Sequence, residues 1–397
     1  MNLKRRIEKT KHCQVVVIGG GIAGVAAAVA AARGGASVLL IEKSIHLGGL
    51  ATGGLISWYE PLCDGEGEQM VFGIAEELIR LACRCGFNNL PQKWGGEGKY
   101  KHRDGRYSSY FSPTVFSLML ERFVRKNDVM LRFDSLAVAP VMQGNICTGV
   151  AVESANGCEL FEADMVIDAT GDASVFHRAG VPTVDGKNYM TYIAHGFTRK
   201  GLEKFEQDDD LCRFRQWINA GSDMLGRGHP EGARYIAGTT TEDIMEFLTA
   251  GKERMLERIE AGEGEIMDLM ALPTMPQFRT IRRIVGNTDF CAVDGQQFSD
   301  SIGTCGDFRK QGFGKHYQIP FGALWNKNYP NLLAAGRIIS APQGDGWEVS
   351  RVIPVCALTG EAAGRSAAIC VSKKKTLAAL NANDIQKIKI TEKEKKQ

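Results

Sequence analysis

The chain has 397 residues, 44% of them hydrophobic, which is enough apolar material for about two globular domains. Its 48 basic and 46 acidic residues nearly cancel, but the first 12 residues carry +4 and residues 373–397 carry +5, leaving −7 between them. An acidic body argues against a DNA or RNA groove, because phosphate recognition depends on clustered lysine and arginine. We therefore expect solvated basic ends and no nucleic-acid partner.

Cysteine content and hydropathy indicate the compartment. Eleven cysteines at irregular spacing are typical of free thiols in a reducing environment, which predicts a cytoplasmic protein. Basic residues 4–11 before the uncharged run 15–32 imitate a signal peptide or a membrane span. Four glycines in that run fall instead at the spacing of a nucleotide-binding loop. We expect neither export nor membrane association.

The first predicted elements form a βαβ unit. A β-branched strand at 15–18 is followed by an alanine-rich helix at 22–33 and a second strand at 37–41. Between the first strand and the helix lies a Gly-x-Gly-x-x-Gly turn, whose N–H groups and positive helix end hold a pyrophosphate. Its glycines are Gly19, Gly21 and Gly24, and Glu42 closes the second strand, where a carboxylate accepts hydrogen bonds from a ribose. The unit predicts a Rossmann-like dinucleotide site.

The rest of the chain divides into a continuation of this domain and an insertion. A glycine-rich loop at 47–54 precedes a predicted helix at 74–84 and a β-meander at 129–168. A buried strand returns at 331–335, before a small-residue helix at 354–369. The predicted fold is α/β, with a discontinuous Rossmann-like FAD-binding domain of parallel sheet and β-meander (1–180 and 321–372), an inserted α+β substrate domain (181–320) and a basic tail (373–397).

Three later segments favour FAD over NAD. Glycines at 47–54 let main chain lie against a flat isoalloxazine ring, and Asp168-Ala-Thr-Gly171 brings a second backbone turn near the dinucleotide. Gly360 and Gly364 lie one helical turn apart and permit close helix packing. If that helix points its N-terminus at the flavin, its partial positive charge stabilises the reduced ring.

Other cofactors and redox groups lack their signatures. The sequence has no second Gly-x-Gly-x-x-Gly loop after a strand, so NAD(P)H would use the substrate cleft transiently. It has no cysteine pair at the spacing of a flavin-linked disulfide and no cluster at zinc or iron–sulfur spacing, so we expect no metal.

The motifs and their order resemble the FAD-dependent oxidoreductase family of the glutathione-reductase structural class. The segments that carry the resemblance are the N-terminal loop with Glu42, 48–54, 168–172, 278–286, 317–320, 333–340 and 350–364. The resemblance implies FAD bound across the glycine loops, with Val138 near the adenine, Gly336-Arg337 near the ribityl chain and 351–356 near the pyrimidine edge. The cofactor-binding residues expected in all are Gly19, Gly21, Ile22, Ala23, Gly24, Glu42, Lys43, Gly49, Leu50, Ala51, Thr52, Val138, Ala169, Thr170, Gly171, Gly336, Arg337, Arg351, Val352 and Cys356.

Candidate catalytic residues come from the inserted domain. Arg282 and Arg283 alternate on a predicted strand, so one should face the cleft, where it could clamp a carboxylate. We choose Arg283, together with His316 and Tyr317 as candidate acid or base, against the alternative of structural roles. His195 lies on an apolar stretch and fits a satisfied core histidine better.

The function expected from these features is FAD-dependent oxidoreduction. A hydride would pass between flavin N5 and a small organic, carboxylated substrate, with the protein supplying orientation and electrostatics. Two alternatives stay open: a flavin-dependent tRNA-modifying protein that uses the basic ends as RNA contacts, and a non-catalytic FAD-binding module. The sequence does not predict the oligomeric state.

Overall fold

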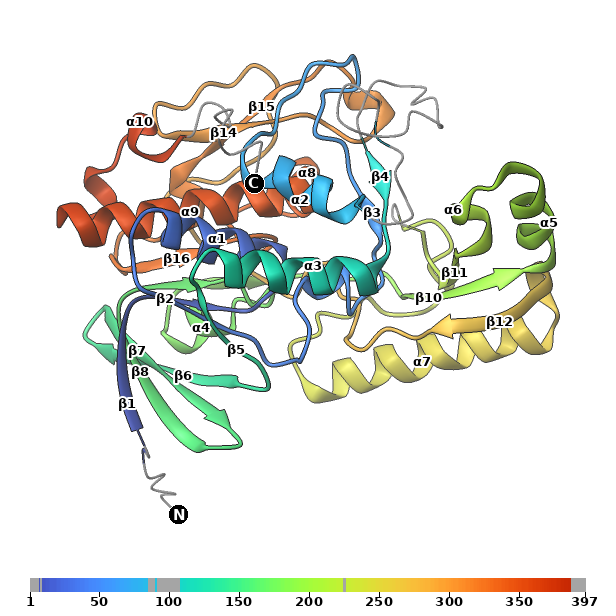
Figure 1. Cartoon of the computed structure of the whole chain (residues 1–397), viewed down its shortest axis with the longest axis horizontal. Helices are drawn as coiled ribbons and strands as arrows, with labels where there is room; N and C mark the ends of the chain where they lie inside the picture. The colour runs from blue at the N-terminus through green and yellow to red at the C-terminus, as the bar shows by residue number, and fades with distance from the viewer. Residues whose placement is uncertain (1–6, 8, 85–89, 91–107, 224–225, 387–397) are drawn as a thin grey trace.

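A computed structural model describes residues 7, 9–84, 90, 108–223 and 226–386. Its largest sheet contains seven strands, six of them in the order β5-β2-β1-β8-β7-β6, and β16 also pairs with β8 (Figure 1). These strands are β1 (Lys9–Ile18), β2 (Val38–Ile41), β5 (Met130–Arg132), β6 (Leu136–Gln143), β7 (Ile146–Ser154), β8 (Gly157–Asp168) and β16 (Leu332–Ala334). The mixed α/β architecture confirms the predicted fold class.

Strand β8 joins the two predicted parts of the sheet. From Glu159 to Asp168 it runs parallel to β1. On its other edge, the first half pairs antiparallel with β7, while residues Val166–Asp168 pair parallel with β16. The predicted β-meander (β6-β7-β8) and the returning strand β16 are therefore both confirmed, and they share one strand.

Helices α1 (Ile22–Arg33), α2 (Ile74–Ala82), α3 (Pro113–Lys126) and α9 (Ile353–Lys373) lie on the same side of this sheet (Figure 1). α1 is built almost entirely of small residues and is buried along nearly its full length. It packs against α9 at Gly360 and Gly364. A Cβ added at Gly360 would lie 2.1 Å from the carbonyl oxygen of Ala23, and one added at Gly364 would lie 2.0 Å from that of Ala27. The predicted close approach is confirmed.

The inserted region contains a second, smaller sheet, β11-β10-β12, which projects to the right in Figure 1. Its strands are antiparallel, and α7 packs against them around Tyr192, Ile218 and Met255. The elements are β10 (Thr191–Thr198), β11 (Gln216–Gly221), β12 (Ile266–Ala271), α5 (Arg199–Asp208), α6 (Leu211–Phe214) and α7 (Thr241–Glu260).

The end of the predicted insertion differs from the structure. Buried Ile284, Ile302 and Ile319 belong to the same core as the large sheet, so the chain returns to this core well before residue 320. Two short antiparallel pairs form there, β9 with β13 and β14 with β15. The remaining elements are β3 (Trp58–Tyr59), β4 (Ser109–Tyr110), α4 (Ser174–Arg178), β9 (Thr183–Asp185), β13 (Arg282–Ile284), β14 (Ser301–Cys305), β15 (Tyr317–Pro320), α8 (Asp345–Ser350) and α10 (Ala382–Ile385), with 3-10 turns at Gly49–Ala51, Glu263–Glu265, Lys310–Gly312, Phe321–Leu324 and Leu377–Ala379.

The first part of the predicted tail is packed. Leu377, Leu380 and Ile385 are buried in the main core, and the Gln386 amide donates to the carbonyl of Ser301 at 2.8 Å. The net charge of this segment predicted a solvated tail. It did not reveal the packing, because three apolar side chains lie among the lysines and polar residues. Residues 387–397 lie outside the described part of the chain.

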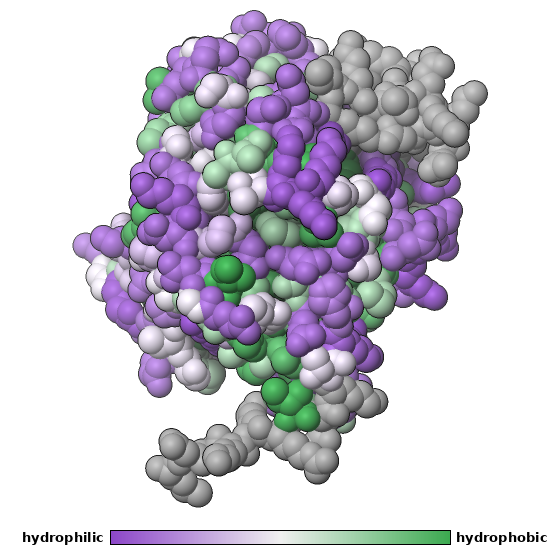
Figure 2. All heavy atoms as spheres, turned by 90° about the vertical axis from the view of Figure 1, so that its left-hand side faces the viewer, coloured by the Kyte–Doolittle hydropathy of each residue, from purple (hydrophilic) through white to green (hydrophobic). Residues whose placement is uncertain are grey.

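The outer surface mixes polar and apolar side chains. Figure 2 shows the left-hand face of Figure 1 covered mostly by hydrophilic residues, with apolar ones scattered among them. Among the described helices, none combines the length and the apolar character needed to cross a bilayer.

The contact between α1 and α9 predicts a destabilised variant. Gly364→Ala gains up to about 1 kcal/mol of helix propensity, but its methyl group meets a helix backbone that has little room to move. Overpacking costs about 1–3 kcal/mol, so urea denaturation should show a net loss of stability. Ser372→Ala, at an exposed position of the same helix, should change the unfolding free energy by less than about 0.5 kcal/mol. Equal stability of the two variants would contradict the close packing.

Candidate functional site

A cavity of about 530 Å³ lies at the carboxyl edge of the large sheet. The register aligns Ile18 with Ile41 and Asp168, and Asp168 with Ala334, so four parallel strands end side by side. The residue that follows each strand, namely Gly19, Glu42, Ala169 or Ala335, lines the cavity. Ligands of open α/β sheets bind at this edge.

The β1–α1 turn forms one end of the cavity with main chain. Gly19 has φ +99°, and a Cβ there would lie 2.5 Å from the carbonyl oxygen of Ala169. At Gly24 a Cβ would lie 1.7 Å from the Gly19 oxygen, so this glycine packs beneath the turn and does not line the cavity. Gly21 caps α1 without a side-chain hydrogen bond, and the first turn holds no acidic residue. The helix therefore presents its positive end to an anion.

Glu42 stands next to this helix end. Its Oε2 accepts from the N–H of Gly20 at 2.6 Å, and its Oε1 accepts from the N–H of Ser44 at 2.8 Å. The carboxylate is thus held rigidly at the cavity wall with lone pairs left for further donors, which suits the two hydroxyls of a ribose.

Seventeen of the twenty predicted cofactor residues line this one cavity, and three do not. Gly24 supports the turn from below, Val138 lies on the meander, where its carbonyl accepts from Arg178 at 3.1 Å, and Val352 is buried as the N-cap of α9. The seventeen are Gly19, Gly21, Ile22, Ala23, Glu42, Lys43, Gly49, Leu50, Ala51, Thr52, Ala169, Thr170, Gly171, Gly336, Arg337, Arg351 and Cys356.

The three predicted catalytic residues lie outside the cavity lining. Arg283 faces Asp289, with Nη1 and Oδ1 3.5 Å apart. Tyr317 is buried, and its hydroxyl donates to Asp307 at 3.4 Å. His316 is partly exposed, with its Nε2 3.2 Å from Asp64 Oδ2. Each side chain therefore has a structural partner away from the cavity.

Asp64, Glu68 and His316 place one ligand-type atom each within 4.8 Å of one another, a grouping that the sequence did not predict. The direct contact between His316 and Asp64 accounts for this grouping without an ion.

His195 is a satisfied core histidine, as expected. Its Nε2 lies 3.1 Å from the Leu55 carbonyl and 3.2 Å from Ser57 Oγ, and its Nδ1 lies 3.2 Å from Arg215. Burial, followed by the charge of Arg215, lowers the His195 pKa to about 4, so the ring is neutral near pH 7. Ser57 in turn accepts from the indole N–H of Trp217, which lines the cavity.

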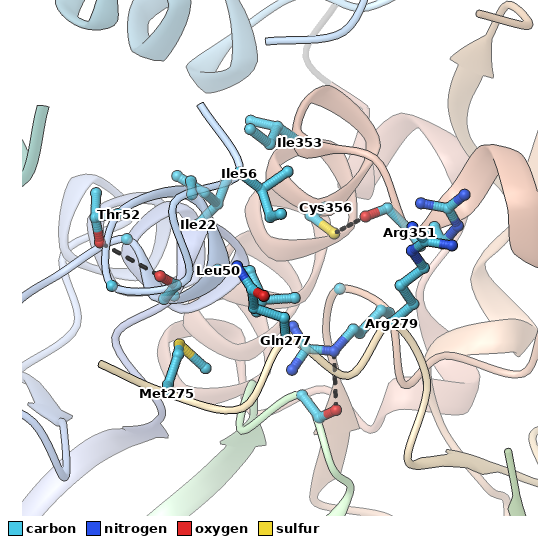
Figure 3. Close-up of a pocket in the computed structure, with 18 of the residues that line it drawn as sticks. Ile22, Leu50, Thr52, Ile56, Met275, Gln277, Arg279, Arg351, Ile353 and Cys356 are labelled. Atoms are coloured by element: carbon cyan, nitrogen blue, oxygen red, sulfur yellow. Dashed lines mark hydrogen bonds between the residues drawn. The ribbon is translucent and has the colours of Figure 1, made fainter. Parts of the chain in front are cut away.

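Among the described residues of the predicted insertion, the arginine that lines the cavity is Arg279, four residues before the one expected (Figure 3). Asn188 accepts from its backbone N–H at 2.9 Å and so fixes this segment. Gln277 anchors the same segment, because its amide donates to the carbonyls of Gly54 and Ile193. Sequence analysis found the segment but not the residue, because strand alternation starts only at Arg282. In the sequence, Arg279 was indicated only by its position in the motif 278–286.

Arg279 and Arg351 lie side by side in the cavity (Figure 3). Arg279 donates from Nη2 to the carbonyl of Asp223 at 3.1 Å, and Arg351 pairs with Glu348 at 2.5 Å. Nη1 of Arg279 and Nε of Arg351 are buried without a hydrogen-bond partner among the described residues. Burial, followed by the neighbouring Arg351 charge, lowers the Arg279 pKa to about 10. The buried donors and the lowered pKa of Arg279 both favour an anion beside these two arginines.

Glu60 is a buried carboxyl in the same cavity. It follows β3, lines the cavity and accepts from the N–H of Ile353, the first residue of α9, at 3.1 Å. Burial raises the Glu60 pKa to about 7, while that N–H and the charge of Arg351 oppose the shift. Sequence analysis did not single out Glu60, since no motif surrounds it.

The aligned strand ends, the glycine turn and Glu42 define a dinucleotide-binding α/β protein. A model of the family "FAD dependent oxidoreductase" matches residues 14–214 and 225–388. The chain belongs to this family, and it is an FAD-dependent oxidoreductase.

Comparison with solved structures gives distant likenesses. A geranylgeranyl bacteriochlorophyll reductase-like protein from Thermoplasma acidophilum has a TM-score of 0.45 at 15% identity, over 92% of this chain and 80% of that one. The myxobacterial chondrochloren halogenase gives 0.49 at 14%, over 93% and 77%. L-proline dehydrogenase from P. horikoshii gives 0.45 at 13%, over 93% and 95%. These likenesses do not identify a substrate. A comparison with curated proteins found no significant match.

FAD fits the residues present. The uncapped end of α1 suits the pyrophosphate and Glu42 the ribose, while Gly49 and Leu50 offer main chain along the cavity. Figure 3 shows Leu50, Ile22 and Ile56 gathered near Cys356, an apolar setting suited to an aromatic ring.

Glu42 provides a test of this fit. Glu42→Ala removes charge-assisted hydrogen bonds to the ribose, and the loss of even one costs about 1.5–3 kcal/mol, so FAD affinity should fall at least roughly 10-fold. Fluorescence titration of the apoprotein measures the affinity. Glu42→Gln keeps one acceptor oxygen and should lose less. Glu162→Ala, at an exposed position of β8, should bind FAD like the wild type. Unchanged affinity in Glu42→Ala would show that FAD does not use this carboxylate.

Glu60 predicts a pH dependence of stability. Its folded-state pKa of about 7 exceeds the ordinary value of 4.5, so the folded protein keeps a proton that the unfolded chain has lost. Stability is therefore lost as the pH rises from about 4.5 to about 7. Relative to Glu60→Gln, the wild type should lose roughly 3 kcal/mol across this window, measured by urea denaturation at each pH. A constant difference between the two proteins would contradict the raised pKa.

Proposed function

We propose that this enzyme transfers a hydride between FAD and a small carboxylated organic molecule, with Arg279 holding the carboxylate. The single observation that carries the proposal is the buried Nη1 of Arg279, which has no hydrogen-bond partner among the described residues. A buried donor without a partner is costly, and a carboxylate is the ligand that fits an arginine fork best. When bound, FAD supplies two-electron chemistry at N5.

The protein's own part is to bind and orient the substrate and to exclude water. Asn188 and Gln277 hold the backbone around Arg279, so its guanidinium approaches the substrate from a fixed position. Trp58, Ile193 and Trp217 line the same cavity and give the substrate's carbon skeleton apolar walls. The walls also shield the charge of Arg279 from water, which strengthens its pairing with an anion.

NAD(P)H is the proposed alternative electron partner. It would have to enter this same cavity transiently, since the sequence holds no second dinucleotide loop. Its phosphates could also use the two arginines. The experiment below therefore includes NADH and NADPH beside the organic acids.

The test is anaerobic bleaching of the FAD-loaded enzyme by NADH, by NADPH and by a panel of 2-hydroxy and 2-amino acids, each acid paired with its primary amide. An acid should bleach the flavin and its amide should not. Arg279→Met should lower the second-order rate at least about 30-fold, since removing one partner of a buried charge pair costs about 2–5 kcal/mol. Arg254→Met, on α7 and outside the cavity, should leave the rate unchanged.

Two results would contradict the proposal. Equal bleaching by acids and amides would show that no carboxylate is recognised. A lower bleaching rate in Arg283→Met, together with a normal rate in Arg279→Met, would show that Arg283 and not Arg279 binds the substrate. Bleaching by NADH or NADPH alone would make the enzyme a reductase whose acceptor remains to be found.

A further inference from the structure

We propose that Glu60 is the catalytic acid–base group of this cavity, a role that rests on the proposed function. In the oxidation direction its carboxylate takes the proton from a substrate O–H or N–H while the adjacent C–H is oxidised. Glu60 is placed for this task because it lines the same cavity as Arg279 and Arg351 and interacts electrostatically with Arg351, the neighbour of Arg279.

Other titratable groups at this end are poorly suited to the role. Asp223 is occupied by Arg227, at 2.7 Å. Burial raises the Cys356 pKa to about 12, and its thiol donates to the Arg351 carbonyl at 3.3 Å. The arginines of the cavity stay protonated near neutral pH, so they cannot accept a proton. Glu42, Lys43 and His46 follow β2 at the nucleotide end of the cavity. Among the described residues that line the cavity, Glu60 is the remaining candidate near the proposed carboxylate site.

The groups packed around Glu60 allow both of its protonation states. The N–H of Ile353 at the start of α9 and the guanidinium of Arg351 stabilise the carboxylate. Glu348 offsets much of the Arg351 charge through its 2.5 Å ion pair. The Tyr59 hydroxyl donates to the Ala75 carbonyl at 2.7 Å and so does not occupy Glu60. Burial favours the neutral acid, and the resulting balance places the Glu60 pKa near the neutral range.

The step balances in atoms and electrons. The substrate H–C–X–H, with X oxygen or nitrogen, loses its carbon-bound hydrogen with the bonding pair as hydride to oxidised FAD. The X–H bond breaks and leaves its electron pair to form C=X, and the proton passes to the Glu60 carboxylate. In the reverse direction protonated Glu60 returns the proton to X.

The experiment compares wild type, Glu60→Gln, Glu60→Asp and Glu66→Gln, all loaded with FAD, using the most active acid from the panel above. Wild-type bleaching should accelerate as the pH rises through about 7, where the base becomes ionised. Glu60→Gln should be slower by about 10²- to 10⁴-fold, without that pH dependence. Its affinity for the acid, measured from the flavin spectrum, should change by less than about threefold. Glu60→Asp should recover part of the rate, and Glu66→Gln, an exposed carboxyl nearby, should match the wild type.

A second measurement follows the proton itself. At about pH 8, above the Glu60 pKa, rapid-scan infrared spectra of the wild type should show the carbonyl stretch of a protonated carboxyl transiently after hydride transfer, before the proton exchanges with solvent. Glu60→Gln should lack this band. A normal rate and pH profile in Glu60→Gln, or a band that persists in it, would overturn the role of Glu60 and leave the proposed substrate class standing. If no acid bleaches the wild type, the proposed function fails first and the role of Glu60 fails with it.

Discussion

The contact between α1 and α9 determines where the two ends of the cavity lie. Gly360 and Gly364 bring α9 against the carbonyls of Ala23 and Ala27, closer than any side chain would allow. α1 begins at the glycine turn of the nucleotide end, whereas α9 begins beside Arg351 and Glu60. A change in the separation of these helices would therefore move the phosphate site relative to the proposed substrate site. The register of β1, β2, β8 and β16 completes this frame.

The charges of the cavity are divided between its ends. The nucleotide end combines an uncapped helix N-terminus with a carboxylate that two backbone N–H groups hold in place. At the other end, two adjacent arginines have buried donors with no hydrogen-bond partner in the described part of the chain, and a carboxyl has a pKa raised to about 7. Such perturbed groups lower stability unless a ligand interacts with them, which is why they mark functional sites more often than structural ones.

Sequence reasoning predicted best what short local patterns determine. The turn at Gly19–Gly24, the acid at Glu42 and the paired glycines of α9 each combine a residue type with a fixed spacing. Of the seventeen predicted cofactor residues in the cavity, those of the glycine turn come from such patterns, whereas others, such as Arg351 and Cys356, come from the resemblance to the family. Val138 does not line the cavity, because a strand pattern does not show which part of the meander approaches the site.

The substrate half depends on contacts between distant segments, which spacing does not reveal. Asn188 and Gln277 turn Arg279 toward the cavity, whereas Arg283, Tyr317 and His316 meet Asp289, Asp307 and Asp64 elsewhere. Glu60 acquires its raised pKa only through burial against α9. The residues near the predicted boundaries at 320 and 373 also depend on such contacts, because Ile319 and Leu377 pack into the main core, which composition does not reveal.

The most direct test of the account is a crystal structure of the FAD-loaded enzyme with oxalate, a small inert dicarboxylate. The account predicts that an oxalate carboxylate accepts hydrogen bonds from Arg279, on the Glu60 side of the flavin. Oxalate bound at Arg283 or His316, or an Arg279 side chain that donates only to FAD, would contradict it.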